Sequence, residues 1–148
     1  MTAATRVLVL NGPNLNRLGT REPDVYGTGT LDELRAELAG AAPEGLEIEL
    51  RQSNDEAELI GWLHEAVDSR SAVILNPAAF THYSYALRDA AALVTEAGLT
   101  LIEVHLSNPY AREEFRRTSV ISAVATGVIA GFGFGSYRLA LARIVEAV

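Results

Sequence analysis

Short apolar runs and amphipathic segments alternate along the whole chain. Apolar runs, continuous or alternating with polar residues, predict five strands, at 7–10, 46–50, 72–75, 99–104 and 128–132. Apolar residues at helical spacing predict the helices between and after them, at 31–38, 59–67, 84–97 and 136–147. The second strand alternates apolar and acidic residues, which is typical of a strand at the edge of a sheet.

This order of elements predicts the fold class. Repeated strand-then-helix units indicate a parallel sheet with right-handed crossovers. Five strands in 148 residues favour a flavodoxin-like α/β fold, with strand order 2-1-3-4-5 and helices on both faces. The chain is long enough for one substantial core and contains no linker or repeat. We therefore expect a single catalytic domain over 1–148.

Local signals mark the helix ends. Capping boxes are predicted at Thr30–Glu33 and Ser53–Glu56, and Gly98 is predicted to end the third helix. A short charged helical turn is expected over 112–115. On the third helix, the apolar residues expected to face the core are Ala86, Ala90, Leu93 and Val94.

One connection is much longer than the others. Residues 11–29 separate the first strand from the first helix, whereas connections in α/β units usually take about 2–6 residues. Long loops of this kind are commonly lids over active sites. This one carries Arg21 and Tyr26. A tyrosine normally ionises near pH ~10, and a neighbouring guanidinium favours the tyrosinate form. We therefore interpret 11–29 as a lid that carries a general base.

The strand ends carry further candidate residues, because ligands of such sheets bind outside the carboxyl ends of the strands. His82 follows the third strand, and Glu103, His105 and Ser107 occupy alternate positions at the end of the fourth. A lone histidine in such a place is usually structural, but two on one rim favour catalysis. Glu103 is suited to orient His105 as a general acid. The third histidine, His64, is expected on a helix surface.

Three other groupings carry weaker signals. The two rim histidines and the adjacent glutamate could bind zinc, but their spacing is scattered, so we expect no metal site. The run 131–136 resembles a phosphate-binding loop, yet it lacks the G-x-G-x-x-G spacing, and close backbone packing is the better interpretation. Arg112 and Arg116 share one side of their turn and are either a solvated charged face or a grip for a carboxylate.

Composition excludes several classes of function. The formal net charge of −7 argues against a nucleic-acid partner. The chain has no cysteine and no lysine, which excludes disulfides, thiol catalysis and a lysine Schiff base. Neither a signal peptide nor a membrane span is visible. We therefore expect a cytoplasmic protein with no membrane partner.

Motifs along most of the chain resemble, in order, those of the type II 3-dehydroquinate dehydratases. They are Leu10–Gly19 with Arg21–Pro23 and Tyr26–Gly27, Arg51–Asn54, Asn76–His82, Leu87–Ala90, Ile102–Asn108 and Arg112–Arg116. Tyr83 departs from this pattern, because the family commonly has threonine there, and the departure bears on packing at the His82 turn. The resemblance implies a lyase that reversibly dehydrates 3-dehydroquinate to 3-dehydroshikimate, a step of the shikimate pathway, without metal or cofactor.

The resemblance also implies residue roles in a mechanism that passes through an enolate. Tyr26 would be the base, Arg21 would favour its tyrosinate form, and Asn14 would hold a water that stabilises the enolate. His105 would be the acid that protonates the departing hydroxyl, with Glu103 orienting it. The physical requirements agree, because loss of water beside a ketone needs a base, an acid and an enolate stabiliser.

Substrate binding and assembly follow from the same resemblance. The residues implied in binding 3-dehydroquinate are Asn76, His82, Leu106, Ser107 and Arg116. Asp89 would reach into a neighbouring subunit's site, since the family assembles as trimers grouped into dodecamers. The non-enzymatic alternative is a flavodoxin-like binding module for flavin or nucleotide, in which the lid covers a ligand without chemistry. A visible absorption spectrum distinguishes the two.

Overall fold

The fold is a parallel sheet of five strands, seen in a computed structural model that describes residues 4–147. The strands are β1 (Arg6–Asn11), β2 (Glu47–Gln52), β3 (Ala72–Asn76), β4 (Leu101–His105) and β5 (Gly127–Ala130). All neighbours are parallel and lie in the order β2-β1-β3-β4-β5. This order confirms the flavodoxin-like fold predicted from the sequence.

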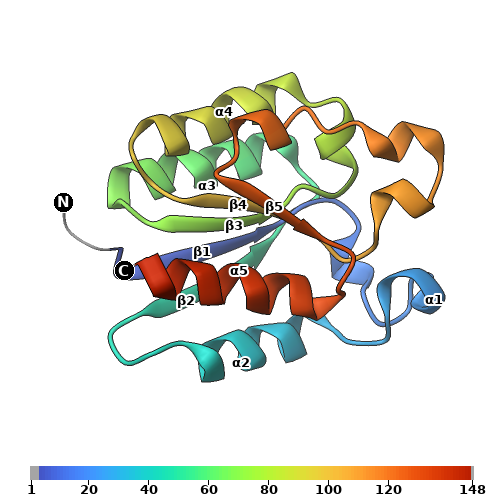
Figure 1. Cartoon of the computed structure of the whole chain (residues 1–148), viewed down its shortest axis with the longest axis horizontal. Coiled ribbons are helices and arrows are strands. Elements are labelled where there is room, and N and C mark those ends of the chain that lie inside the picture. Colours follow the sequence, from blue (N-terminus) through green and yellow to red (C-terminus); the bar gives the residue numbers. More distant parts are fainter. Residues whose placement is uncertain (1–3, 148) are drawn as a thin grey trace.

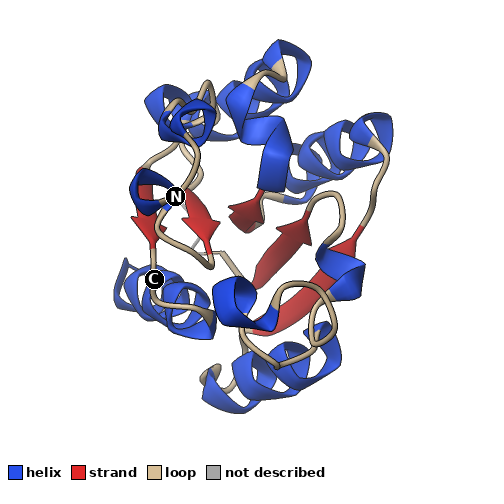
Figure 2. Ribbon diagram, turned by 90° about the vertical axis from the view of Figure 1, so that its right-hand side faces the viewer, coloured by secondary structure: helices blue, strands red, loops and turns tan. Residues whose placement is uncertain are grey.

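Four long helices cover the sheet. They are α2 (Leu31–Ala41), α3 (Glu56–Ser69), α4 (Tyr85–Glu96) and α5 (Phe134–Ala147). Figure 1 shows α3 and α4 on one face of the sheet and α2 and α5 on the other, and Figure 2 shows the strands between these two layers. A short helix, α1 (Pro23–Tyr26), lies in the connection after β1. No helix within residues 4–147 combines the length and apolar character needed to cross a membrane.

The strands bury both of their faces because alternate side chains point to opposite layers. In β1, Val7 and Val9 join the core beneath α2 and α5, whereas Leu8 and Leu10 join the core beneath α3 and α4. All four are fully buried. A continuous apolar run is therefore what this central strand requires. The edge strand β2 is mostly half-buried, as its alternating sequence predicts.

The helix ends agree with the sequence at two places and differ at a third. The Thr30 side chain accepts a hydrogen bond from the Glu33 backbone N–H (3.2 Å), and Gly98 follows the C-cap of α4 with φ +79°. The predicted cap at Ser53 is wrong, because the side chain of Asp55 caps α3. Ser53 continues the strand pairing instead, since its N–H donates to the carbonyl of Asn11 (3.0 Å).

The buried face of α4 also differs from the prediction. The buried residues are Leu87, Ala90, Ala91 and Val94. Ala86 is exposed and Leu93 is 44% exposed, so the expectation that both face the core is wrong. Each lies one residue before a buried position, which is a turn of about 100° around a helix. The exposed pair places apolar surface on the outside of α4.

The strand register gathers polar residues at one edge of the sheet. Asn11 at the end of β1 lies beside Gln52 of β2 and Asn76 of β3. On the other side of β3, Glu103 of β4 pairs with Leu75. The carboxyl ends of β1, β3 and β4 therefore meet where ligands of such sheets bind.

Candidate active site

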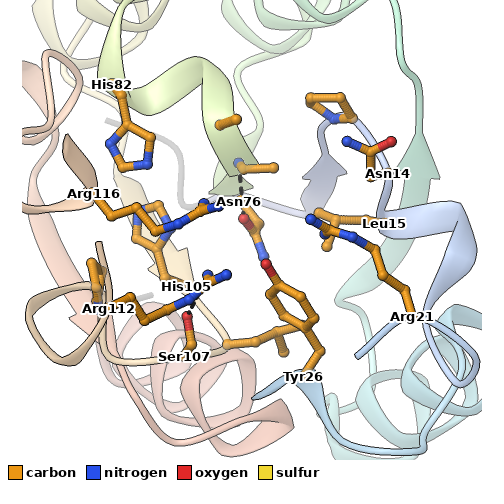
Figure 3. Close-up of a pocket in the computed structure, with 15 residues that line it drawn as sticks. Asn14, Leu15, Arg21, Tyr26, Asn76, His82, His105, Ser107, Arg112 and Arg116 are labelled. Carbon is orange, nitrogen blue, oxygen red and sulfur yellow. Dashed lines mark hydrogen bonds between the residues drawn. The ribbon is translucent and has the colours of Figure 1, made fainter. Parts of the chain in front are cut away.

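A cavity of about 80 Å³ lies at the carboxyl ends of the central strands. Its walls come from the connection after β1, from the 3₁₀ turn η2 (Ala78–His82) and from the segment after β4. Figure 3 shows Asn14 and Arg21 on one side of it, with His82 and Arg116 on the other. The residues expected at the site that line this cavity are Asn14, Arg21, Tyr26, Asn76, His82, His105, Leu106, Ser107 and Arg116.

The connection that forms one wall is more ordered than a loop. The predicted lid, 11–29, starts one residue early, because its first residue belongs to β1. The remainder contains two short elements, the 3₁₀ turn η1 (Leu15–Arg17) and α1. Leu15 and Leu18 are 4% and 7% exposed and belong to the core beneath α2 and α5. Two leucines are enough to anchor this half of the segment.

The start of the same connection is tied to β3. The Gly12 backbone N–H donates to the carbonyl of Asn76 (2.8 Å). A Cβ on Gly12 would lie 2.6 Å from the carbonyl oxygen of Pro77, so the close approach requires glycine. Asn14 has φ +70°, and its N–H donates to Oδ1 of Asn54 (2.9 Å). These contacts fix the backbone of Asn14 at the cavity wall.

Tyr26 lies against two guanidinium groups. The Cζ atoms of Arg21 and Arg112 are 4.7 Å and 5.0 Å from the centre of the Tyr26 ring. Both distances lie within the range of about 6 Å in which a cation and an aromatic ring attract. Arg112 is also held by Ser107, to whose Oγ it donates (3.3 Å). The predicted contact between Arg21 and Tyr26 is present, and Arg112 adds a second cation to it.

Glu103 and His105 form a buried pair at the end of β4. His105 Nε2 is bonded to a carboxylate oxygen of Glu103, and the two side chains are 12% and 1% exposed. Burial acts to raise the pKa of Glu103, but hydrogen bonds from His105, Ser122 and Thr81 outweigh it and hold the pKa below the ordinary value. The ionised carboxylate accepts the hydrogen bond from Nε2 and so fixes the orientation of the imidazole.

His82 faces the cavity from η2 and is bonded to a backbone carbonyl, whereas His105 is bonded to a carboxylate. Its Nδ1 donates to the Thr118 carbonyl (2.7 Å), which leaves Nε2 as an acceptor, and its ring meets the Phe115 ring edge-on with centres 5.6 Å apart. Burial lowers the pKa of His82, and the positive charges of His105 and Arg116 lower it further. The imidazole is therefore neutral at neutral pH and suited to accept a hydrogen bond from a ligand hydroxyl.

Asn76 is held by a buried tyrosine that the sequence did not single out. The Tyr137 hydroxyl of α5 accepts from Nδ2 of Asn76 (2.9 Å) and donates to Oδ1 of Asn11 (2.6 Å). The Asn76 Oδ1 in turn accepts from the Ala78 N–H (3.0 Å). Burial raises the pKa of Tyr137, so its hydroxyl stays protonated. One hydroxyl thus joins the ends of β1 and β3 to α5.

The glycine-rich run after β5 supports the site through its backbone. The N–H groups of Gly131 and Gly133 donate to the carbonyls of His105 (3.2 Å) and Leu106 (2.9 Å), so these donors are not free to hold a phosphate. Close packing is not the reason for the glycines, because a Cβ on Gly131 would meet nothing nearer than 3.5 Å. Their φ values of +96° and +58° are the reason. The turn they form ends β5 two residues before the predicted boundary and lets α5 begin two residues early.

Other predicted residues lie elsewhere. Asp89 is exposed on α4 and does not line the cavity, and Glu103 lies behind His105. His64 is exposed on α3, as predicted. The ring of Tyr83 is 59% exposed and packs edge-on against Phe80, so it does not displace the His82 turn. Across residues 4–147, the structure places no three histidine, aspartate or glutamate side chains where they could hold a metal ion.

Two features of the site were not predicted from the sequence. One is the contact of Arg112 with the Tyr26 ring, and the other is the set of three hydroxyls around Glu103. For Arg112, the signal was present in its spacing of four residues from Arg116, although the predicted helical turn at 112–115 is instead a 3₁₀ turn, η4 (Glu114–Arg117). The hydroxyls belong to Thr81, Ser119 and Ser122. No local pattern marks them, because Glu103 is 16 to 22 residues away in sequence.

Comparisons with known proteins all indicate the same family, and each match covers most of the chain. Residues 5–145 match the family described as Dehydroquinase class II. A 3-dehydroquinate dehydratase of Salinispora tropica is 60% identical over 137 residues, covering 92% of this chain and 94% of the relative. Another, of Bacillus licheniformis, is 58% identical over 142 residues and 95% of each chain. The crystal structure of a type II dehydroquinase from Propionibacterium acnes is 48% identical, with a TM-score of 0.91 over 99% of both chains.

Proposed function

The chain belongs to the class II dehydroquinase family, and we propose that its cavity dehydrates 3-dehydroquinate by the residue roles set out below. The activity itself, conversion of 3-dehydroquinate to 3-dehydroshikimate in the shikimate pathway, follows from the identity with relatives that carry this name. Membership of an enzyme family also sets aside the binding-module alternative. The mechanism is argued from the geometry of the cavity.

The charge of the cavity suits an anionic substrate. Three arginines and two histidines line it, and no carboxylate does. The substrate carries one carboxylate and several hydroxyls. Arg116 is the proposed partner of the carboxylate, together with the backbone of Leu106 and Ser107. Neutral His82 and the amide of Asn76 are proposed to bind hydroxyls.

Proton removal is assigned to Tyr26. The phenolate takes a proton from the carbon beside the ketone, and the electrons of that C–H bond form an enolate. Arg21 and Arg112, both against the Tyr26 ring, favour the phenolate by their charge. Asn14, fixed at the wall of the cavity, is proposed to hold a water that donates to the enolate oxygen.

Departure of the hydroxyl is assigned to His105. As the enolate collapses, the carbon–oxygen bond breaks, and the leaving oxygen takes a proton from the protonated imidazole and departs as water. Nε2 of His105 is occupied by Glu103, so Nδ1 is the nitrogen that donates. The Glu103 carboxylate stabilises the positive imidazole before the transfer. All atoms and charges of the dehydration are then provided by substrate and side chains, without a cofactor.

Assembly and the lid belong to the same proposal. We place Asp89 in a neighbouring subunit's site, within trimers grouped into dodecamers, and its exposure on α4 outside its own cavity supports this placement. The exposed apolar Tyr85 and Leu93 on the same helix give such a contact its apolar area. Residues 12–29 are proposed to act as the lid of the single catalytic domain, and the cytoplasm as its compartment.

One observation carries the mechanism: a tyrosine against two arginines lines the same cavity as a histidine backed by a buried carboxylate. The test follows 3-dehydroshikimate formation by its ultraviolet absorbance. Tyr26→Phe and His105→Ala should each lower kcat by about 10²–10⁴-fold while substrate still binds. Tyr110→Phe, which changes a tyrosine that is 68% exposed and does not line the cavity, is the control and should match the wild type. Near-normal turnover by either site variant refutes that residue's role.

A further inference from the structure

Three hydroxyl groups surround the carboxylate of Glu103. Thr81 Oγ1 donates to Oε2 (2.8 Å), Ser122 Oγ donates to Oε1 (2.6 Å), and Ser119 Oγ lies 3.1–3.2 Å from both oxygens. The hydroxyl oxygens of Thr81 and Ser119 are also 2.7 Å apart. We call Thr81, Ser119 and Ser122 the hydroxyl cage. With Nε2 of His105, it supplies donors to both oxygens of a side chain that is 1% exposed.

The cage is held in place by the segment 118–122 and its neighbours. The Val120 N–H donates to the Thr81 carbonyl (2.7 Å), and the Val120 carbonyl accepts from Nη1 of Arg88 on α4 (2.9 Å). Ser119 Oγ accepts from the N–H groups of Ile121 and Ser122 (3.1 and 3.0 Å). Each serine is therefore fixed by more than its bond to Glu103, and the carboxylate is enclosed by a preformed surface.

The chemical nature of the cage matters as much as its geometry. A buried carboxylate needs donors on its lone pairs, or it takes up a proton and loses its charge. A lysine or arginine would supply donors but would also cancel the charge that the imidazole requires. Neutral hydroxyls stabilise the carboxylate and leave its negative charge to act on the imidazole of His105, to which it is bonded. Every donor in the cage is uncharged.

We propose that the hydroxyl cage is the positioning device of the acid, which aims an ionised Glu103 at Nε2 of His105 so that Nδ1 faces the leaving group. Thr81, Ser119 and Ser122 touch neither substrate nor reacting atoms, and they act only through Glu103. This inference rests on the proposed function, in which His105 is the acid. It gives the segment 118–122 a role that the roles argued from the sequence do not include.

The decisive variant is Ser122→Ala, because it removes the shorter donor to Oε1. A hydrogen bond to a charged group is lost, so we expect kcat to fall about tenfold while KM changes less than about twofold. Ser122→Thr keeps a hydroxyl and should restore most of the loss. The matched control is Ser71→Ala, another serine bonded to a charged residue, since its Oγ accepts from Arg6 at the opposite end of the sheet. That variant should turn over like the wild type.

A double variant tests whether the cage acts through Glu103. Ser122→Ala should lower kcat in the wild type but add nothing in a Glu103→Gln background. The melting temperature of Ser122→Ala should also fall less steeply at acid pH than that of the wild type, because loss of a donor raises the folded pKa of Glu103 toward its ordinary value. The other charged or titratable groups that line the cavity with His105 are Arg21, Tyr26, His82, Arg112 and Arg116, and none of them is altered. Thr81→Val repeats the test from η2 if Ser122→Ala folds poorly.

The outcomes separate this inference from the proposed function. If the wild type is active and neither Ser122→Ala nor Thr81→Val changes kcat, the inference about the hydroxyl cage is overturned and the proposed function stands. A Ser122→Ala loss of equal size in the Glu103→Gln background also overturns it, since the serine would then act by another route. Full turnover by His105→Ala would show that His105 is not the acid. Absence of turnover in the wild type would refute the whole proposed function. Each of these two results removes the cage's role with it.

Discussion

The substitution Tyr137→Phe removes one hydroxyl from the centre of the fold. That hydroxyl joins Asn11 of β1 and Asn76 of β3 to α5, over distances of 2.6 Å and 2.9 Å. The three residues are 0–3% exposed, so water cannot replace the lost partner without entering the core. Phenylalanine fits the same space because it differs only by the missing oxygen. The variant therefore isolates the two hydrogen bonds.

The expected size of the effect follows from these contacts. A buried polar group that loses its partner costs about 1–3 kcal/mol, so two such groups cost about 2–6 kcal/mol. Unfolding entropy of about 2.1 cal/mol/K per residue gives about 0.3 kcal/mol/K for a chain of 148 residues. The melting temperature should therefore fall by about 6–19 °C. Asn76 also loses a contact that orients its amide in the cavity, so KM should rise more than kcat falls.

The assay is thermal unfolding at one fixed protein concentration, because assembly makes the melting temperature depend on concentration. Tyr110→Phe is the matched control, since this tyrosine is 68% exposed and belongs to no proposed contact. An exposed change of this kind usually stays within about 0.5 kcal/mol, or about 2 °C here. A Tyr137→Phe melting temperature within the same margin would refute the reasoning. The shared hydroxyl would then not be what holds the two asparagines at the strand ends.

Three further predictions concern the remaining parts of the site. If Arg21 and Arg112 favour the phenolate of Tyr26, replacing either with glutamine should move the rising limb of the kcat/KM profile to higher pH, and an unmoved limb with a raised KM would indicate substrate binding only. Asp89→Ala and Tyr26→Phe should each be inactive, but co-expressed chains should recover partial activity in isolated mixed oligomers, unless Asp89 serves its own subunit. Glu103 contributes stability that is fully present above a free glutamate's pKa of about 4.3 and is lost as pH falls through its lower folded pKa. Glu103→Gln should therefore flatten the acid side of a plot of melting temperature against pH, and an unchanged slope there would contradict this.

The strands and their order were predictable because their signal is local. A continuous apolar run such as 7–10 is stable only where both faces are covered, and covered faces require helices on each side. Alternation of strands and helices then leaves few topologies. Element ends were less predictable because they depend on neighbours. Serine is a common N-cap residue, yet the Ser53 N–H extends the strand pairing by donating to the carbonyl of Asn11. Asp55 therefore caps α3, and the helix begins two residues later than the sequence predicts.

The residues of the candidate site also fall into two groups: those whose position has a local signal in the sequence, and those whose role depends on distant neighbours. The long connection after β1 and the two rim histidines could be placed at the cavity from their positions alone, since strand ends meet at one edge. Tyr137 could not, because its partner Asn11 is 126 residues away and nothing in the helical pattern distinguishes it from an ordinary core aromatic. The face of α4 was misjudged for a related reason. Ala86 and Leu93 are as apolar as their buried neighbours, so composition does not separate the two faces.

A chain with a net charge of −7 nevertheless presents a cationic cavity, and distance explains how. Charges separated by more than about 8–10 Å in physiological salt are largely screened, so the acidic surface contributes little inside the cavity. At about 4 Å the interaction of two charges near a protein surface reaches about 4 kcal/mol, so the local arginines dominate. The carboxylates nearest to Arg21 and Arg116 are Glu22 and Glu113, at 3.6 Å and 3.1 Å, and both glutamate side chains are more than half exposed. Solvent screens such exposed pairs, so each guanidinium is only weakly held by its glutamate and can pair with an anion that enters the cavity.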